Sequence, residues 1–217
     1  MRNIVIIGGF GNGTVVQSTI FDINQVQPQY NVIGFLNDFE TGDINGVPIL
    51  GKITKENVQN LIKEKDAYFF YALISLKMNY KKLDKLTDLN VPLERFETFV
   101  HPTAVISNTA KIGQNVCIQP FVSVGPNVVI QNFVQIFAQS LIGHGATLKN
   151  YSYVANNACI GASVVLQEGA YLGTNATTIE FIELGEWSVV GMGSVVLKTV
   201  ADYDKVVGNP GRVVGKN

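Results

Sequence analysis

A six-residue repeat between residues 100 and 200 constrains this chain more than any other feature of its sequence. Stepping by six from Val100 gives an aliphatic column that Thr178 alone interrupts. Its members are Val100, Ile106, Ile112, Ile118, Val124, Ile130, Ile136, Ile142, Leu148, Val154, Ile160, Leu166, Leu172, Thr178, Leu184, Val190 and Val196. Four residues after each member lies a second column of small or β-branched residues, from Ala104 to Val200.

A period of six matches neither the 3.6 residues of a helical turn nor the simple alternation of an ordinary strand. Short repeats of this kind indicate a parallel β-helix, in which each repeat forms one flat side and the stacked coils bury the aliphatic column. At about three repeats per coil, the run predicts nearly six coils of roughly 18 residues. Glycines recur just after the first column, at Gly113, Gly125, Gly143, Gly161, Gly173, Gly185 and Gly191.

Composition and charge narrow the class of protein. A hydrophobic fraction of 47% is ample for buried cores. The net charge of −1 argues against a nucleic-acid-binding protein, because such proteins usually carry a strongly basic surface. The apolar run at the N-terminus is too short for a signal peptide or a membrane span, so we expect no membrane insertion and a cytoplasmic location. Cys117 and Cys159 should fall on different faces of the repeat, in keeping with a reducing compartment.

The first 95 residues have a different pattern. Residues 3–7 predict a strand and residues 8–13 a glycine-rich turn. The following residues predict a helix, with Val15, Val16, Thr19, Ile20 and Ile23 at helical spacing. The further expected elements are a strand at 30–36, a helix at 54–65, a strand at 67–74 and a helix at 80–89. This order predicts a small parallel α/β, Rossmann-like domain over 1–95, followed by a β-helix domain over 96–217.

The order and spacing of these features resemble the hexapeptide-repeat sugar O- and N-acyltransferases over essentially the whole chain. The segments that carry the resemblance are Gly34-Phe35-Leu36-Asn37-Asp38, Gly46-Val47-Pro48-Ile49-Leu50-Gly51, His101-Pro102-Thr103-Ala104 and Gly208-Asn209-Pro210-Gly211-Arg212-Val213. The resemblance implies a left-handed β-helix, acetyl-CoA or another acyl-CoA as co-substrate, no metal, and a homotrimer with sites between the β-helices.

The resemblance also implies roles for individual residues. His144 matches the catalytic base, and the residues matching the coenzyme A site are Gly143, Ala162, Gly173 and Arg212. In the N-terminal domain, Gly9, Phe10 and Gly11 would bind the pyrophosphate of a nucleotide sugar at a helix start, and Asn37 and Asp38 its ribose or base.

The sequence departs from the family around His144. Both neighbours of this histidine are glycine where the family has an acidic residue, and a second histidine and an asparagine of the family correspond here to Tyr153 and Phe137. His101, the other histidine of the chain, is expected to have a structural role.

The function implied is acylation of the amino group of a nucleotide-linked (UDP or dTDP) 4-amino-deoxy sugar in bacterial glycan biosynthesis. O-acetylation of a sialic acid or another hydroxyl is the alternative, and the sequence does not determine the acyl group. The N-terminal domain could instead bind a regulatory nucleotide. Two histidines exclude the zinc carbonic anhydrase variant of this fold, which needs three histidine ligands. Mixed outward-facing residues disfavour a purely structural solenoid.

Overall fold

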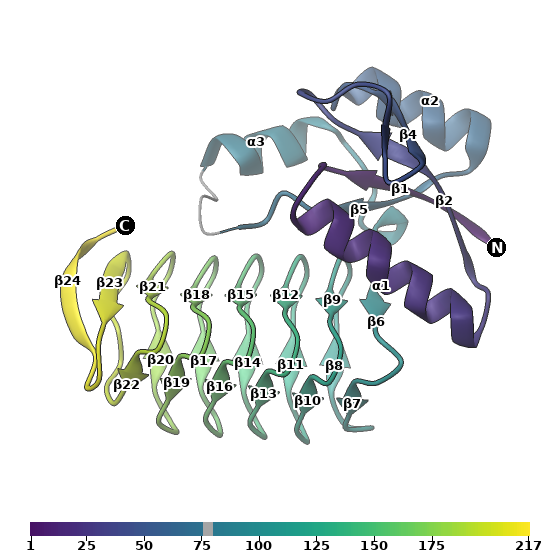
Figure 1. The fold of residues 1–217 in the computed structure, drawn as a ribbon. Coiled ribbons are helices and arrows are strands. Elements are labelled where there is room, and N and C mark those ends of the chain that lie inside the picture. The colour runs from purple at the N-terminus through teal and green to yellow at the C-terminus, as the bar shows by residue number, and fades with distance from the viewer. Residues whose placement is uncertain (76–79) are drawn as a thin grey trace. The chain divides into compact units, whose positions relative to one another are not determined.

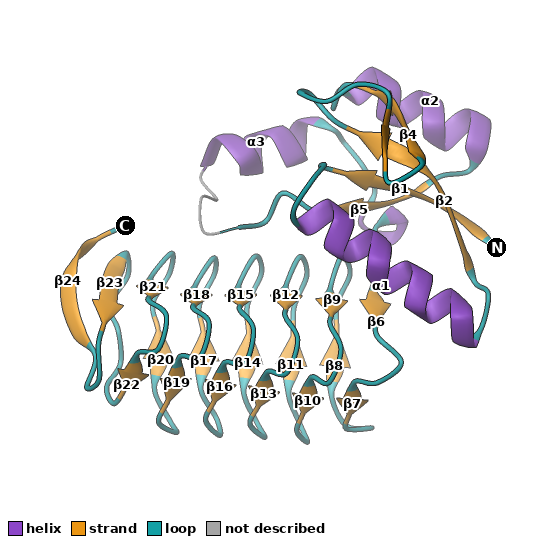
Figure 2. Cartoon of the chain, in the orientation of Figure 1, coloured by secondary structure: helices purple, strands orange, loops and turns teal. Residues whose placement is uncertain are grey.

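The computed structural model describes residues 1–75 and 80–217. The chain divides into two compact units, Met1–Pro102 and Thr103–Asn217, which Figure 1 colours by residue number and Figure 2 by secondary structure. Within the described residues, no helix has the length and apolar character needed to cross a bilayer.

The N-terminal unit is built around a five-stranded sheet in the order β3-β4-β2-β1-β5. Its strands are β1 (Arg2–Ile7), β2 (Tyr30–Leu36), β3 (Asp43–Ile44), β4 (Val47–Gly51) and β5 (Tyr68–Tyr71). The other elements are α1 (Asn12–Val26), α2 (Lys55–Lys65), α3 (Tyr80–Asp88), a 3₁₀ turn at Leu93–Arg95 and β6 (Phe99–Val100). All pairs in the sheet are parallel except β3 with β4. The predicted parallel α/β arrangement is confirmed.

Strand β1, which lies between β2 and β5, is buried on both faces over its second half. Residues 4–7 of β1 have no exposed surface, and α1 packs against β1 and β2 with Val16 and Ile20 inward. Figure 1 shows β1, β2 and β5 between α1 and α2. Helix α2 begins where the hydroxyl of Thr54 accepts a hydrogen bond from the N–H of Asn57 (3.2 Å), a common N-cap.

Two details differ from the sequence-based expectation. The strand predicted at 67–74 is shorter in the structure, where it is β5 (Tyr68–Tyr71). Its partner β1 ends at Ile7, so the last hydrogen bond between the two strands is the one from the N–H of Ala72 to the carbonyl of Ile7. The β3–β4 hairpin was not predicted, although Asn45-Gly46, both with positive φ, is a strong short-hairpin signal.

The second unit is a left-handed parallel β-helix, as predicted. Sheet I contains β7 (Val105–Ile106), β10 (Ser123–Val124), β13 (Leu141–Ile142), β16 (Cys159–Ile160), β19 (Thr177–Thr178) and β22 (Val195–Val196). Sheet II contains β8 (Lys111–Ile112), β11 (Val129–Ile130), β14 (Thr147–Leu148), β17 (Val165–Leu166) and β20 (Glu183–Leu184). Sheet III contains β9 (Cys117–Ile118), β12 (Gln135–Ile136), β15 (Tyr153–Val154), β18 (Tyr171–Leu172), β21 (Val189–Val190), β23 (Asp204–Val207) and β24 (Arg212–Lys216).

The aliphatic column forms the core of this β-helix. Its members from Ile118 to Val196 are buried, and coils stack in a register of 18 residues, as in the pairing of Ile142 with Ile160. Thr178 is buried in the column as well, and its hydroxyl accepts a hydrogen bond from the N–H of Gly161 (3.0 Å). Cys117 and Cys159 lie on sheets III and I as free thiols, which confirms their predicted separation.

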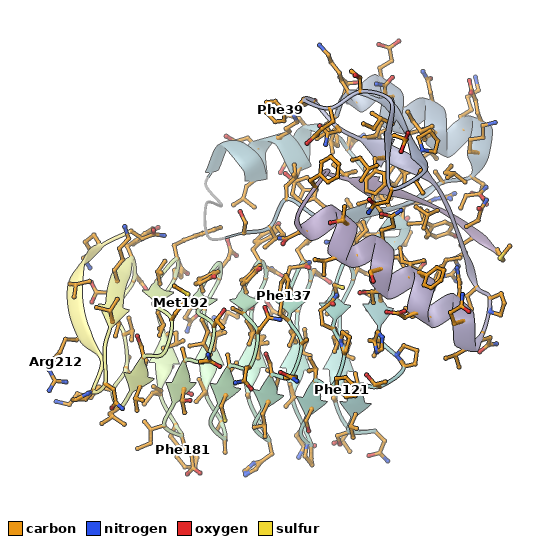
Figure 3. All side chains as sticks on the ribbon, in the orientation of Figure 1. Phe39, Phe121, Phe137, Phe181, Met192 and Arg212 are labelled. Atoms are coloured by element: carbon orange, nitrogen blue, oxygen red, sulfur yellow. The ribbon has the colours of Figure 1, made fainter. Side chains whose placement is uncertain are left out.

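Fourteen successive corners of the β-helix each contain one residue with left-handed backbone. These residues recur every six positions at φ values between 54° and 69°: Asn115, Phe121, Asn127, Phe133, Gln139, Gly145, Tyr151, Asn157, Ser163, Gly169, Asn175, Phe181, Trp187 and Gly193. Glycine and asparagine adopt this region readily, whereas bulky side chains adopt it at a cost. Phe121 and Phe181 occupy such corners while remaining 63% and 74% exposed, and Figure 3 labels both.

Replacing Phe181 with Asn should stabilise the protein by about 1 kcal/mol, because the substitution relieves the left-handed penalty and removes little buried surface. Urea denaturation followed by circular dichroism measures the change. Phe39→Asn is the matched control, since Phe39 is 91% exposed but has no positive φ. Equal stabilisation by both substitutions would mean that the backbone is not the cause.

Acidic residues gather at the corner between sheets II and III. Burial first, and then the neighbouring charge of Glu186, raise the pKa of the Glu168 carboxyl, with Lys149 acting in the opposite direction. A carboxyl whose pKa is higher in the folded than in the unfolded state stabilises the fold only while it is protonated. Its contribution is therefore lost as the pH rises through the folded-state pKa.

Glu168→Gln should raise the unfolding temperature at pH 7, where the wild-type carboxylate is charged, and change it little at about pH 4, where the carboxyl is protonated. Scanning calorimetry at both pH values measures the difference. The solvent-exposed Glu64→Gln control should show no such pH-dependent gain. A Glu168→Gln effect of the same size at both pH values would contradict the ionic explanation.

Candidate functional site

A glycine-rich turn connects β1 to α1. The N–H of Gly8 donates to the carbonyl of Leu36 (3.0 Å), and Gly11, at φ 86°, immediately precedes the helix. No side chain caps the first turn of α1. The exposed Phe10 projects from the turn. Uncapped N–H groups at a helix start are suited to hydrogen-bonding an anion, so the turn has the local chemistry expected for Gly9, Phe10 and Gly11.

Asn37 holds the end of β2 against this turn. Its side-chain oxygen accepts hydrogen bonds from the N–H groups of Phe39 (2.8 Å) and Glu40 (3.1 Å), and its amide nitrogen donates to the carbonyl of Gly8 (3.1 Å). The residue is 6% exposed. Both polar atoms of the side chain are used in these hydrogen bonds, so Asn37 stabilises the glycine-rich turn.

Asp38 is also engaged within the N-terminal unit. One carboxylate oxygen accepts from the N–H of Ile53 (2.9 Å), and the other pairs with the Lys85 ammonium of α3. Burial tends to raise the pKa of Asp38, but the bonds from Lys85 and Ile53 and the charge of Lys85 outweigh it, and the pKa falls below its ordinary value. The carboxylate therefore stays charged at neutral pH and half-exposed beside the turn.

Glu40 is a residue of this region that the sequence did not single out. Its Oε2 atom is buried and has no hydrogen-bond partner among the described residues. A Cβ atom on Gly9 would lie 2.9 Å from that oxygen and 2.0 Å from Asn37 Nδ2, so only glycine fits there. A buried acceptor without a partner has no sequence signature, and only the structure identifies it.

Asn37→Ala should lower the free energy of unfolding by about 1–3 kcal/mol, since it leaves the two N–H donors and the Gly8 carbonyl without their partner. Chemical denaturation of the variant measures the loss. Asn31→Ala, which removes an exposed side-chain bond to Asn3, should change the stability by less than about 0.5 kcal/mol. An Asn37→Ala protein as stable as the wild type would contradict the supporting role.

His144 lies at a corner between sheets I and II. It follows β13, its imidazole is exposed, and its carbonyl accepts a hydrogen bond from the N–H of Ser163 on the next coil (2.9 Å). No described residue forms a hydrogen bond or ion pair with its ring. A Cβ on Gly143 would approach the N atom of Ala162 to 2.7 Å, so the glycine keeps the coils in contact beside the histidine. Gly143, His144 and Ala162 thus form one local surface.

Phe137, Tyr153 and Gly173 lie on sheet III, the side of the coil opposite that corner. The Phe137 and Tyr153 rings pack with centroids 4.8 Å apart, and Tyr171 stacks on Tyr153 at 4.9 Å. This aromatic ladder replaces the polar pair expected from the family. A single chain therefore does not bring Phe137, Tyr153 or Gly173 together with His144.

Arg212 begins β24 at the end of the β-helix, where Figure 3 labels it. It borders a cavity of about 560 Å³ lined by Val196, Leu197, Lys198, Thr199, Val200, Val206, Pro210, Gly211, Arg212 and Val213. Lys198 is a second cation of this cavity that the sequence comparison with the family did not indicate.

His101 has a structural environment, as expected. The residue is 8% exposed, and its Nε2 atom lies 3.2 Å from a carboxylate oxygen of Asp22 in α1. Over residues 1–75 and 80–217, no group of three or more histidine, cysteine or acidic side chains is arranged to hold a metal ion.

Comparisons with protein families agree with this two-part organisation. The family model described as the GMPPB C-terminal domain matches residues 95–215, more than half of the chain, and the PglD N-terminal domain model matches residues 3–86. No curated protein sequence gave a match.

Solved structures share the whole fold. The acetyltransferase domain of PglB from Neisseria gonorrhoeae has 22% identity and a TM-score of 0.86, with 99% of this chain and 100% of that chain covered. A mutant of perosamine N-acetyltransferase from Caulobacter crescentus, in complex with CoA and GDP-perosamine, has 22% identity and a TM-score of 0.86, covering 100% and 98%. WeeI from Acinetobacter baumannii has 22% identity and a TM-score of 0.73, covering 98% and 100%.

A Rossmann-like unit followed by a left-handed β-helix of six-residue repeats is the fold that the chain shares with these acetyltransferases. The chain belongs to the family described as the GMPPB C-terminal domain, and its N-terminal unit matches the PglD N-terminal domain model.

Proposed function

We propose that the protein transfers an acyl group from acyl-CoA to the amino group of a nucleotide-linked 4-amino-deoxy sugar, in bacterial glycan biosynthesis in the cytoplasm. The observation that carries the proposal is the exposed His144 on a corner flanked by glycine, in a chain of this family. The perosamine enzyme with CoA and GDP-perosamine and an N-acyltransferase from Bacillus cereus with dTDP and coenzyme A support the substrate class. UDP, dTDP and GDP sugars are therefore all candidates.

In this reaction the sugar nitrogen attacks the thioester carbonyl carbon. The C–N bond forms, the C–S bond breaks, and the coenzyme leaves as a thiolate. His144 takes the proton that the nitrogen loses, and the thiolate takes up a proton to become the free thiol. Among residues 1–75 and 80–217 no carboxylate pairs with the imidazole, so its orientation depends on the bound substrates. We propose that the backbone at Gly143 and Ala162 contacts the pantetheine arm.

We infer that a complete site needs two copies of the chain in a homotrimer. His144 lies opposite sheet III, where Gly173, Phe137 and Tyr153 lie, so these residues meet His144 only if a second copy supplies them. The outer face of sheet I supports such packing, since it exposes Val105 (69%), Leu141 (46%), Ile179 (47%) and Leu197 (52%). The flat sides of a β-helix favour closed cyclic packing.

In the N-terminal unit, we propose that residues 9–11 bind the diphosphate of the nucleotide sugar. The uncapped start of α1 supports this role. Asp38 contributes through the part of its carboxylate left accessible by Lys85 and Ile53, while Asn37 contributes by shaping the turn. A regulatory nucleotide at the same turn is the second candidate, and product analysis separates the two.

His144→Ala and His144→Asn should each lower turnover by about two orders of magnitude or more, because the proton acceptor is lost. Thiol release from acetyl-CoA and longer acyl-CoA donors, with UDP-, dTDP- and GDP-linked amino sugars as acceptors, measures the rate. Asn156→Ala is the matched control, since Asn156 is an exposed corner residue at the same place in its repeat. Near-wild-type turnover in either histidine variant would remove His144 from the reaction.

The same assay separates N-acylation from O-acetylation. Mass spectrometry and NMR of the product show whether the acyl group is on nitrogen. Turnover of a sialic acid or another hydroxyl acceptor, with none of an amino sugar, would replace the proposed function by its alternative.

A further inference from the structure

A second cavity lies in the N-terminal unit, between α1 and the uncovered part of the sheet. Residues of α1, β2 and the β3–β4 hairpin line it. Its volume of about 420 Å³ is within the range of small-molecule sites. None of the residues given roles in the proposed reaction lines this cavity.

The cavity extends away from the glycine-rich turn. It begins beside Thr14, in the first turn of α1, and reaches the start of β2. The lining residues of β2, Tyr30 to Val32, pair with residues 2–4 of β1, whereas Leu36 pairs with Ile7 just before the turn. Val32 and Leu36 are therefore roughly 13 Å apart along the strand. A ligand of the cavity would not occupy the place proposed for the nucleotide sugar.

The cavity has an apolar floor and an exposed aromatic side chain. Ile20 is fully buried, and Val32 and Val47 are partly buried. Phe21, the next residue of α1, lines the same cavity and is 62% exposed. Most of its surface is therefore accessible, and its ring offers a flat apolar face to a ligand.

None of the described residues that line the cavity is charged. The polar side chains are neutral amides and hydroxyls. The Asn45 amide nitrogen donates to Gln17 Oε1 (3.2 Å), while Asn45 Oδ1, Gln17 Nε2 and the Ser18 hydroxyl form no hydrogen bond with described residues. The cavity thus offers both donors and acceptors without a charge.

The far end of the cavity is fixed by Asn24. Its side-chain oxygen accepts hydrogen bonds from the N–H groups of Gln29 (3.0 Å) and Tyr30 (3.1 Å), and its amide nitrogen donates to the carbonyl of Tyr30 (2.8 Å). These bonds attach the last turns of α1 to the start of β2. The cavity is therefore formed before any ligand binds, which lowers the cost of binding.

We propose that this cavity binds a neutral saccharide ring. A pyranose has an apolar C–H face that packs on an aromatic side chain, and its hydroxyls both donate and accept hydrogen bonds. An anionic ligand would lose its hydration here without meeting a cation. The site is separate from the one proposed for the nucleotide sugar, so this inference goes beyond the proposed function.

Titration calorimetry of the full-length protein with the methyl glycosides of glucose, galactose and mannose tests the proposal. The corresponding methyl uronides, which differ by one carboxylate, are the matched charged ligands. At least one neutral glycoside should bind with a Kd of about 10 mM or lower, and about tenfold more tightly than its uronide.

Two variants test whether that glycoside binds in this cavity. Phe21→Ala should weaken its binding by about fivefold, because the ring face is lost. Asn45→Gly removes the amide but suits the positive φ of 49°, and should weaken binding by about fivefold as well. Phe39→Ala is the matched control, since Phe39 is 91% exposed in the same unit but does not line the cavity.

No binding of any neutral glycoside, binding of the uronides as tight as that of the neutral ligands, or equal effects of Phe21→Ala and Phe39→Ala would overturn the proposal. Circular dichroism of each variant confirms that it is folded. These measurements need no acyl transfer, so a protein that binds the glycoside but transfers no acyl group would count against the proposed function and not against this site.

Discussion

The structure of the second unit depends on one constraint, the hydrogen bonding of each short strand to the strand 18 residues later. Two-residue strands such as β13 and β16 pair in this register, and the corners between Asn115 and Gly193 turn through a left-handed residue with a period of six. Inside the coils this register buries the aliphatic column. On the outside it aligns equivalent corners, so that His144, Ala162 and Glu180 follow one another along a single edge.

The same register determines which residues can act together. His144 and the aromatic ladder of Phe137, Tyr153 and Tyr171 lie on different sides of the β-helix. Phe137 and Tyr153, seven and nine positions from His144 in sequence, therefore do not form a site with it within one chain. Residues 54 positions apart, in contrast, share an edge, as His144 and Lys198 do. The acyl donor that we propose would have its thioester near the exposed His144 of this edge.

Much of the fold could be predicted because its signals are periodic or local. The hexads predicted the strands of the β-helix, and the glycine turn after residues 3–7 predicted the start of α1. The β3–β4 hairpin was missed although Asn45-Gly46 signalled it. Other features had no sequence signal: nothing local shows that Phe181 adopts a left-handed backbone, that Asn37 is occupied by the N–H groups of Phe39 and Glu40, or that residues 208–211 bind back to β22. Such features depend on contacts that the fold itself creates.

A crystal structure of the assembled protein with coenzyme A and a nucleotide-linked amino sugar tests the account most directly. The coenzyme sulfur and the sugar nitrogen should meet at the corner between sheets I and II, with a ring nitrogen of His144 within about 3 Å of the sugar nitrogen. Sheet III of a second copy would complete the site. A sulfur and a sugar nitrogen that meet on another face, out of reach of His144, would contradict the account.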